Sequence, residues 1–142
     1  MTVSTLIKGK SHEIMTISQN DSLRDVCKIL ADKRIGVLIV CSSAGHVEGI
    51  ISERDIVRSI GTSGPHILDE FVKQHMTKDP VTCSPIESID NVMSKMSQGR
   101  FRHMPVLEDK KLVAIISIGD IVKARIEAME QEARAMHEYI GT

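Results

Sequence analysis

The apolar residues of the chain follow helical spacing in some segments and strand-like runs in others. An apolar stripe at positions i, i+3, i+4 and i+7 follows Ser22, a candidate helix N-cap, and consists of Leu23, Val26, Cys27 and Leu30. Short apolar runs at 37–40 and 47–52 lie on either side of a Ser-Ser-Ala-Gly turn, which predicts a β-hairpin. A further helix is expected to begin near Glu53. Residues 15–60 therefore predict the order strand, helix, strand, strand, helix.

The second half of the chain repeats this pattern. Residues 50–57 read I-I-S-E-R-D-I-V and residues 115–122 read I-I-S-I-G-D-I-V, so six of the eight positions agree. Further pairs match upstream with a shift of one residue: Thr16/Thr82, Ser18/Ser84, Ser22/Ser88, Val26/Val92, Arg34/Arg100 and Val40/Val106. Pro105 lacks a backbone donor, so its strand is expected to lie at a sheet edge or to be interrupted. An internal period of about 65 residues indicates two copies of one small unit, which we expect to pack on each other.

The duplication predicts five segments along the chain. They are an N-terminal linker segment (1–14), a first repeat (15–60), a linker helix (61–80), a second repeat (81–125) and a C-terminal helical tail (126–142). The last helix is expected to continue toward Tyr139 and carries one apolar stripe, formed by Ile121, Val122, Ile126, Met129, Ala133, Met136 and Ile140. That stripe packs either on its own core or, since the tail extends past the repeat, against a partner subunit.

Composition narrows the class of protein. The chain has 142 residues, 42% of them hydrophobic, and a formal net charge of −1. This is typical of one soluble domain and gives no bulk attraction to nucleic acid or to an anionic membrane. No apolar run approaches the roughly 20 residues that span a bilayer, and no secretory signal opens the sequence, so we expect a cytoplasmic protein. The three cysteines show no C-x-x-C pairing and are expected to be core residues rather than metal ligands.

A Ser-x-x-Asp element follows the last strand of each repeat, as Ser52 with Asp55 and as Ser117 with Asp120. Either pair can cap the helix that starts there, because the serine accepts a hydrogen bond and the aspartate reaches back to a backbone N–H. The same helix start can instead bind a phosphate, and a carboxylate can accept hydrogen bonds from both hydroxyls of a ribose. The two roles are compatible.

With this element present twice, the chain resembles a tandem pair of cystathionine-β-synthase (CBS) domains over roughly residues 3–125. The segment 99–106, G-R-F-R-H-M-P-V, is similar to the second-strand signature of that family, and residues 34–40 keep its shape without the proline. The resemblance implies an α/β (α+β) fold in which two βαββα repeats pack about a pseudo-two-fold axis, called a CBS pair or Bateman module. It also implies two clefts, a homodimer and an adenosine ligand: AMP, ADP, ATP, NAD(H) or S-adenosylmethionine.

In that family each cleft combines residues of both repeats. The cleft named here the Asp120 cleft would contain Ser117, Asp120, Ile115 and Arg102 with Thr16, Ile35 and Gly36. The Asp55 cleft would contain Ser52, Asp55 and Ile50 with Thr82, Arg100 and Phe101. Arg54 and His103 can neutralise phosphate charge, and Ile17 and Val81 can line an apolar slot for adenine. The Asp120 cleft is expected to bind an anionic ligand better, because the cationic Arg102 stands where the first repeat has Gly36.

The leading interpretation is a regulatory module that binds an adenine nucleotide, AMP above all, and forms a homodimer. It has no catalytic residue and no metal, and neither nucleic acid nor membrane is its partner. An enzyme is less favoured, because the sequence contains no P-loop, G-x-S-x-G, H-E-x-x-H or G-x-G-x-x-G motif. A third interpretation is a structural dimerisation module whose clefts bind nothing. The sequence leaves open the adenosine ligand, the occupancy of each cleft and the regulated partner.

Overall fold

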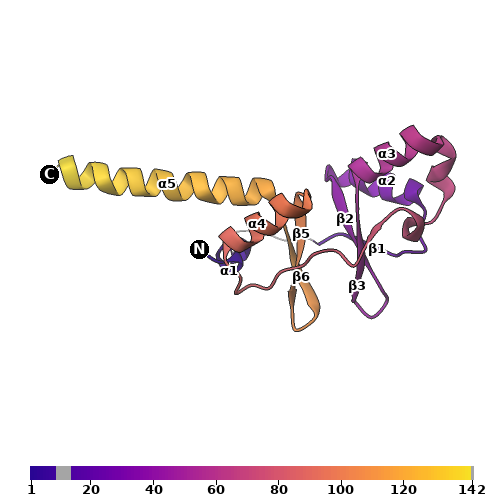
Figure 1. The fold of residues 1–142 in the computed structure, drawn as a ribbon, viewed down its shortest axis with the longest axis horizontal. Helices are drawn as coiled ribbons and strands as arrows, with labels where there is room; N and C mark the ends of the chain where they lie inside the picture. The colour runs from indigo at the N-terminus through magenta and orange to yellow at the C-terminus, as the bar shows by residue number, and fades with distance from the viewer. Residues whose placement is uncertain (9–13, 142) are drawn as a thin grey trace.

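A computed structural model describes residues 1–8 and 14–141 and contains two α/β units followed by a long helix (Figure 1). The first unit has a four-stranded sheet of order β1-β2-β3-β4, formed by β1 (Thr16–Ile17), β2 (Val37–Cys41), β3 (Val47–Ser52) and β4 (Thr77–Lys78). β1 is parallel to β2, and the other neighbours are antiparallel. Helices α2 (Leu23–Lys33) and α3 (Glu53–Ser63) pack on this sheet. The predicted element order of the first repeat is confirmed.

The second unit consists of the hairpin β5 (His103–Glu108) and β6 (Lys111–Ser117) with helices α4 (Ile89–Gly99) and α5 (Ile118–Gly141). Its expected first strand is reduced to one parallel bridge between Cys83 and Val106. Cys83 N–H donates to Pro105 O (3.1 Å), and Leu107 N–H donates to Cys83 O (2.8 Å). The next bond of a parallel ladder would come from the N–H of residue 105, which proline lacks, so the ladder stops there.

Each unit is completed by the segment that precedes the other repeat. Helix α1 (Val3–Lys8) packs on the core of the second unit, where Val3 is fully buried. Val3 N–H donates to Glu87 O (2.9 Å), and Ile89 N–H donates to Met1 O (3.1 Å). Residues 1–8 are therefore part of the second unit. The remainder of the predicted N-terminal linker, except Ile14, lies outside the described residues.

The segment between the repeats makes the equivalent exchange in the other direction. Val72 N–H donates to Asp21 O (2.8 Å), and Leu23 N–H donates to Glu70 O (3.1 Å). They correspond to the two bonds of the second unit, Val72 to that of Val3 N–H with Glu87 O and Leu23 to that of Ile89 N–H with Met1 O. The same pattern of hydrogen bonds in both units reflects the pseudo-two-fold relation between the repeats.

This intervening segment forms two 3₁₀ helices instead of the predicted single linker helix. They span Pro65–Asp69 and Val72–Gln74, and α3 continues as far as Ser63, into the predicted linker. Glu70 has an extended backbone (φ −83°, ψ 164°), because its carbonyl is engaged by the first unit. An extended residue interrupts the i→i−4 hydrogen bonds of an α-helix, so a continuous helix cannot form here.

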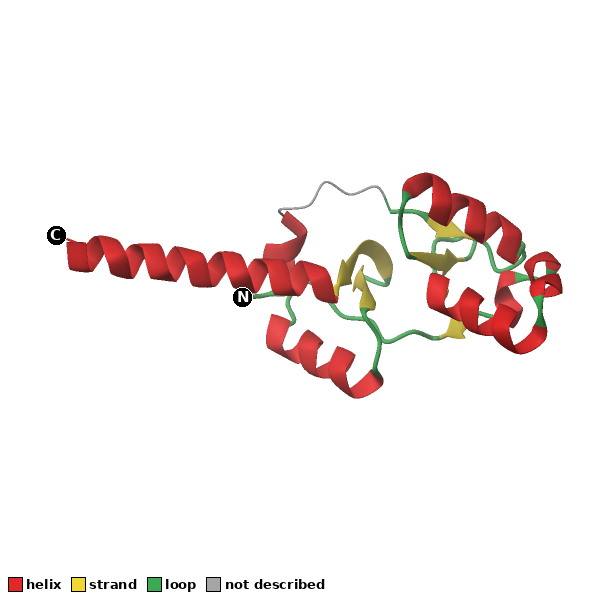
Figure 2. Ribbon diagram, turned by 90° about the horizontal axis from the view of Figure 1, so that it is seen from above, coloured by secondary structure: helices red, strands yellow, loops and turns green. Residues whose placement is uncertain are grey.

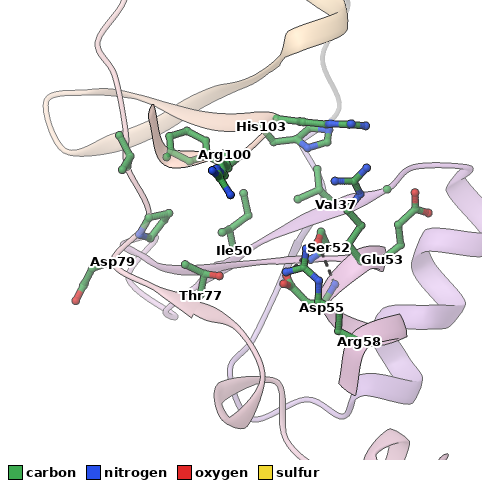
Figure 3. A pocket seen from close by; sticks show the side chains of 17 residues that line it. Val37, Ile50, Ser52, Glu53, Asp55, Arg58, Thr77, Asp79, Arg100 and His103 are labelled. Carbon is green, nitrogen blue, oxygen red and sulfur yellow. Dashed lines mark hydrogen bonds between the residues drawn. The ribbon is translucent and has the colours of Figure 1, made fainter. Parts of the chain in front are cut away.

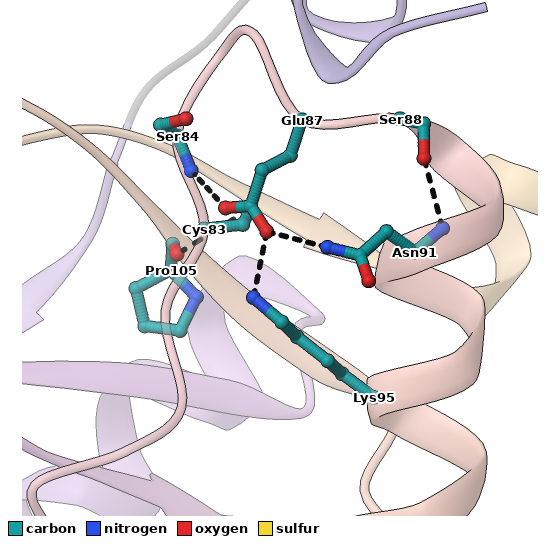
Figure 4. A network of polar contacts seen from close by, with 7 residues as sticks. All are labelled: Cys83, Ser84, Glu87, Ser88, Asn91, Lys95 and Pro105. Atoms are coloured by element: carbon teal, nitrogen blue, oxygen red, sulfur yellow. Dashed lines mark hydrogen bonds and ion pairs between the residues drawn. The ribbon is translucent and has the colours of Figure 1, made fainter.

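The turn that leads into α4 is held by the carboxylate of Glu87 (Figure 4). Its oxygens accept hydrogen bonds from Ser84 N–H (2.7 Å), Asn91 Nδ2 (2.9 Å) and Lys95 Nζ (2.6 Å). Partial burial opposes ionisation, but the bonds from Lys95 and Ser84 outweigh it and hold the pKa of Glu87 below its ordinary value. Glu87 thereby fixes the segment to which α1 docks.

Helix α5 begins on the second unit and its C-terminal part projects away from the body (Figures 1 and 2). Ile121 is fully buried, whereas the rest of the large apolar side chains of the predicted stripe are exposed: Val122, Ile126, Met129, Met136 and Ile140. Beyond Ile121 the stripe therefore does not pack on its own core. Among the described helices, none is long and apolar enough to cross a membrane.

Candidate ligand-binding site

Both Ser-x-x-Asp elements form reciprocal caps at helix starts. Ser52 N–H donates to Asp55 Oδ2 (2.9 Å), and Asp55 N–H donates to Ser52 Oγ (3.3 Å). Ser117 N–H donates to Asp120 Oδ2 (2.9 Å), and Asp120 N–H donates to Ser117 Oγ (3.1 Å). The predicted capping role is confirmed for both pairs. The Ser52 hydroxyl also donates to Asp55 Oδ2 (3.0 Å), so both hydrogen bonds that Ser52 donates use one carboxylate oxygen and leave Asp55 Oδ1 for another donor.

A cavity of about 400 Å³ lies beside Asp55, between the two repeats (Figure 3). Ser52 and Asp55 border it from the first repeat, and Arg100 and His103 border it from the second (Figure 3). The residues that line it are Gly36, Val37, Ile50, Ser52, Glu53, Arg54, Asp55, Arg58, Thr77, Asp79, Pro80, Val81, Gly99, Arg100, Phe101, Arg102 and His103. Small-molecule sites are typically of this size, from roughly 300 to 1,000 Å³.

On the side of the first repeat, the start of α3 lies close to the start of β2. Glu53 N–H donates to Gly36 O (2.9 Å). A Cβ added to Gly36 would lie 3.3 Å from Glu53 Oε1, so the absence of a side chain at Gly36 lets the Glu53 carboxylate lie against the backbone. The equivalent bond in the second repeat runs from Ile118 N–H to Arg102 O (2.8 Å).

On the side of the second repeat, the end of α4 turns the chain toward the cavity. Arg100 is the C-cap and adopts the left-handed conformation (φ 56°). This turn places Phe101 beside Gly99, where an added Cβ would overlap the Phe101 ring. Gly99 therefore has to lack a side chain for Phe101 to occupy its present position.

The third side of the cavity is formed by the chain that follows β4. β4 pairs with β3 through Lys78 opposite Gly49 and Thr77 opposite Ile50. A Cβ on Gly49 would lie 2.8 Å from Thr77 O, so glycine permits the close approach of β4. Sequence reasoning missed Thr77, Asp79 and Pro80; the signal that could have indicated them is a glycine inside a strand, which often marks close backbone approach.

The lining combines cationic and apolar side chains. Arg54, Arg58, Arg100 and Arg102 outnumber the three acidic residues of the lining, Glu53, Asp55 and Asp79. The apolar part of the wall consists of Val37, Ile50, Pro80, Val81 and Phe101. The arrangement can bind an anion through guanidinium groups and a flat apolar group against the aliphatic wall.

The structure brings together most of the residues predicted for the Asp55 cleft. The predicted residues that line the cavity are Gly36, Ile50, Ser52, Arg54, Asp55, Val81, Arg100, Phe101, Arg102 and His103. Of these, Gly36 and Arg102 were predicted for the Asp120 cleft and line the cavity beside Asp55. The lining residues outside the predicted site list are Val37, Glu53, Arg58, Thr77, Asp79, Pro80 and Gly99.

The other predicted site residues lie outside this cavity. They are Thr16, Ile17, Ile35, Thr82, Ile115, Ser117 and Asp120. Ile17 is almost completely buried in the first core, and Ile35 packs against the same core. The Asp120 cleft stays a prediction, and Arg102, on which its expected advantage was based, lines the cavity beside Asp55.

The three cysteines do not line this cavity. All three cysteines are free thiols, with Cys83 buried and Cys27 and Cys41 half-buried. Burial, and to a lesser degree the Glu87 carboxylate, raise the pKa of the Cys83 thiol to about 11, which leaves it protonated and unreactive at neutral pH. Within residues 1–8 and 14–141, no group of three or more His, Cys, Asp or Glu side chains could hold a metal ion.

Comparison with known proteins places this geometry in a family. The sequence profile of the CBS domain matches residues 7–62 and again residues 72–127. The chain is 29% identical over 147 residues to the Arabidopsis thaliana "CBS domain-containing protein CBSX3, mitochondrial", covering 98% of this chain and 71% of that protein. It spans only between 21% and 24% of five longer Arabidopsis thaliana relatives.

Two crystal structures show the same fold. The CBS-domain containing protein ATU1752 from Agrobacterium tumefaciens is 38% identical with a TM-score of 0.84, over 88% of this chain and 99% of that one. The CBS domain pair of protein MJ0100, solved in complex with 5′-methylthioadenosine and S-adenosyl-L-methionine, is 25% identical with a TM-score of 0.79, over 90% and 98% of the two chains. The duplicated sequence, the paired units and these matches agree: the chain belongs to the CBS domain family and carries two CBS domains in tandem.

Proposed function

We propose that this CBS pair is a regulatory module that binds an adenine nucleotide, AMP above all, in the cavity between its repeats. The observation that carries the proposal is the position of Asp55, whose carboxylate borders a cavity that guanidinium groups of both repeats also line. Asp55 Oδ1 accepts from the ribose hydroxyls, while Oδ2 keeps the cap of α3. Arg100 and Arg102 bind the phosphate, and the adenine lies against Ile50 and the apolar wall.

The charge of the lining favours a phosphorylated ligand. MJ0100, whose CBS pair is similar to this chain, was solved with two adenosine compounds that carry no phosphate. That complex supports an adenosine ligand here as a class. In this chain four arginines line the cavity against three carboxylates, and a cationic surface attracts AMP or ATP more strongly than a neutral thioether or a sulfonium.

Binding between the repeats gives the module a means of regulation. The wall is assembled from the first repeat, the second repeat and the chain after β4, so a bound ligand contacts all three. A ligand shifts a conformational equilibrium only through its different affinity for the two states. A ligand that bridges the repeats favours the arrangement in which all of its contacts are made. The homodimer, the absence of catalysis and the cytoplasmic location expected from the sequence belong to the same proposal.

The experiment that tests the proposal is a ligand panel on the purified chain. Thermal shift and titration calorimetry with AMP, ADP, ATP, NADH and S-adenosylmethionine should give the tightest binding for AMP. At a ligand concentration of 100 times Kd the stabilisation is about 2.7 kcal/mol, which is several degrees for a domain of this size. Tightest binding of NADH or S-adenosylmethionine would select those alternatives, and no response to any ligand would favour the structural dimerisation module. Chromatography of the incubated nucleotide should recover it intact; hydrolysis would indicate an enzyme.

A further inference from the structure

The exposed stripe of α5 has the spacing of a coiled-coil seam. Its members follow one another at alternating intervals of four and three residues: Val122, Ile126, Met129, Ala133, Met136 and Ile140. This spacing is the a/d pattern of a heptad repeat, which keeps one apolar edge facing a second helix. A stripe that only covered its own body would end where the body ends.

The seam is exposed along its whole length. The exposed fraction of its large side chains ranges from 47% at Val122 to 76% at Ile140. Contact with the body is made by a different side of the helix, on which Ile121 is fully buried. The C-terminal part of α5 projects from the body (Figures 1 and 2). A single helix without tertiary contacts gains most of its stability only when its apolar face is packed against another surface.

The charges beside the seam are separated along the helix. Lys123 and Arg125 flank its start, and Glu130 and Glu132 flank its middle. Lys123 and Glu130 lie on one side of the seam, and Arg125 and Glu132 lie on the other, in the positions that set orientation in coiled coils. Arg125 also pairs with Asp90 of α4 on the exposed surface.

We propose that the seam binds the same seam of a second copy of this chain, with the two helices antiparallel. Val122 then packs opposite Ala133 of the partner subunit, and Ile126 packs opposite the partner's Met129. In this register Lys123 faces the partner's Glu130 and Arg125 faces the partner's Glu132, and each contact occurs twice by symmetry.

The first turn of α5 supports this register. The register places Met136 of the partner subunit opposite Gly119. Ile118, Gly119, Val122 and Ile126 line an open apolar groove, and a Cβ on Gly119 would meet only Ser117 Oγ at 3.6 Å. A long flexible methionine fills a hollow above a glycine well. A parallel pair would instead place Gly119 against Gly119 and Lys123 beside Ile118, which leaves the groove empty and gives Lys123 no carboxylate from the partner subunit.

The association is tested on the full chain by light scattering after size-exclusion chromatography, with sedimentation equilibrium at several concentrations. The wild type should be a dimer. Met129→Glu places a charge in the seam and should raise the dimer dissociation constant at least tenfold, while the matched control Gln131→Glu, on the opposite side of the same helix, should leave it unchanged. A monomeric wild type, or a dimer that Met129→Glu does not weaken, overturns the proposal.

Orientation is tested with two cysteine variants, Val122→Cys and Ala133→Cys, oxidised separately and as a mixture. In the antiparallel register the two positions face each other, so the mixture should give a crosslinked dimer, and each variant alone should give no more than the wild type with its three native cysteines. Crosslinking of each variant alone indicates a parallel pair and overturns the antiparallel assignment. The absence of any crosslink above the wild-type level overturns it as well.

Discussion

The carboxylate of Asp55 combines two roles, the cap of α3 and the proposed contact with ribose. Replacing Asp55 by alanine removes both, so a control variant that loses only a cap is needed to separate them. A matched control exists inside the same chain. Asp25 forms the equivalent reciprocal cap with Ser22 at the start of α2, where Ser22 N–H donates to Asp25 Oδ2 (3.4 Å) and Asp25 N–H donates to Ser22 Oγ (3.1 Å). Asp25 does not line the cavity. Asp25→Ala therefore removes a cap without touching the proposed ligand contact.

The two variants should lose similar stability but differ in affinity. Loss of a cap typically costs about 1 kcal/mol, or a few degrees in Tm for a domain of this size. The loss of stability should be somewhat larger for Asp55→Ala than for Asp25→Ala, because Asp55 Oδ2 accepts two hydrogen bonds from Ser52 at 2.9 and 3.0 Å. In addition, each hydrogen bond to the carboxylate from a ribose hydroxyl contributes about 1.5 kcal/mol or more, so one or two of them correspond to roughly 10-fold to 100-fold weaker binding of AMP.

The assay is titration calorimetry of AMP into the wild type and both variants, after urea unfolding has shown that each is folded. We expect the AMP Kd of Asp25→Ala to stay within a factor of about two of the wild type, which is the size of change that a mutation far from the site produces. Equal affinities of Asp55→Ala and Asp25→Ala would show that Asp55 is only a cap, and the assignment of the ribose contact would be wrong.

Three further predictions concern the second carboxylate, the approach of β4 and the Glu87 network. Asp120→Ala should weaken binding in its cleft by about 10-fold to 100-fold; unchanged calorimetric affinity in a folded variant would remove Asp120 from any ligand site. Gly49→Ala should cost about 1–3 kcal/mol in urea unfolding and weaken AMP binding, because its Cβ would lie 2.8 Å from Thr77 O and displace β4; wild-type stability would contradict the close approach. Glu87→Gln should cost about 1–2 kcal/mol at pH 7. Since the folded pKa of Glu87 is depressed, its contribution is present above about pH 4.5 and is lost as the pH falls through the folded pKa, so the free energies of unfolding of wild type and variant in urea should converge below that pKa; a difference that persists once the carboxylate is protonated would exclude it as the source.

The elements whose information is local could be predicted from the sequence. Ser22, Ser52 and Ser88 accept the capping hydrogen bonds expected of them, because an N-cap involves only residues within one helical turn. Hairpins β2–β3 and β5–β6 follow from two adjacent apolar runs and a short turn. The duplication also gave an independent copy of each pattern, which fixed the order of elements in both halves.

The exchange of segments could not be predicted, because its partners are distant in sequence and carry no shared pattern. Val3 packs in a core whose other members start at Cys83, and nothing in a six-residue helix indicates which core it joins. The prediction of a single linker helix was wrong for a related reason. The apolar spacing of the linker fits a helix, but tertiary hydrogen bonds to Asp21 and from Leu23 hold Glu70 and Phe71 in extended backbone, and tertiary contacts override local spacing. Asp79 and Pro80, which line the cavity just after β4, were missed for the same reason.

The two repeats retain the same backbone frame at the strand-to-helix junction but carry different side chains there. Gly36 O accepts the hydrogen bond of Glu53 N–H at 2.9 Å, and Arg102 O accepts that of Ile118 N–H at 2.8 Å, so the strand-to-helix junction is preserved in both copies. Onto that frame the first repeat places Glu53 and Arg54, where the second has Ile118 and Gly119. A charged helix start and an uncharged one attract phosphate to different extents, since fixed charges dominate recognition of an anion at short range. We therefore expect the two clefts to differ in affinity for one nucleotide, so that a single module responds over two concentration ranges; two equal sites in a calorimetric titration would show that the substituted positions do not face the ligand.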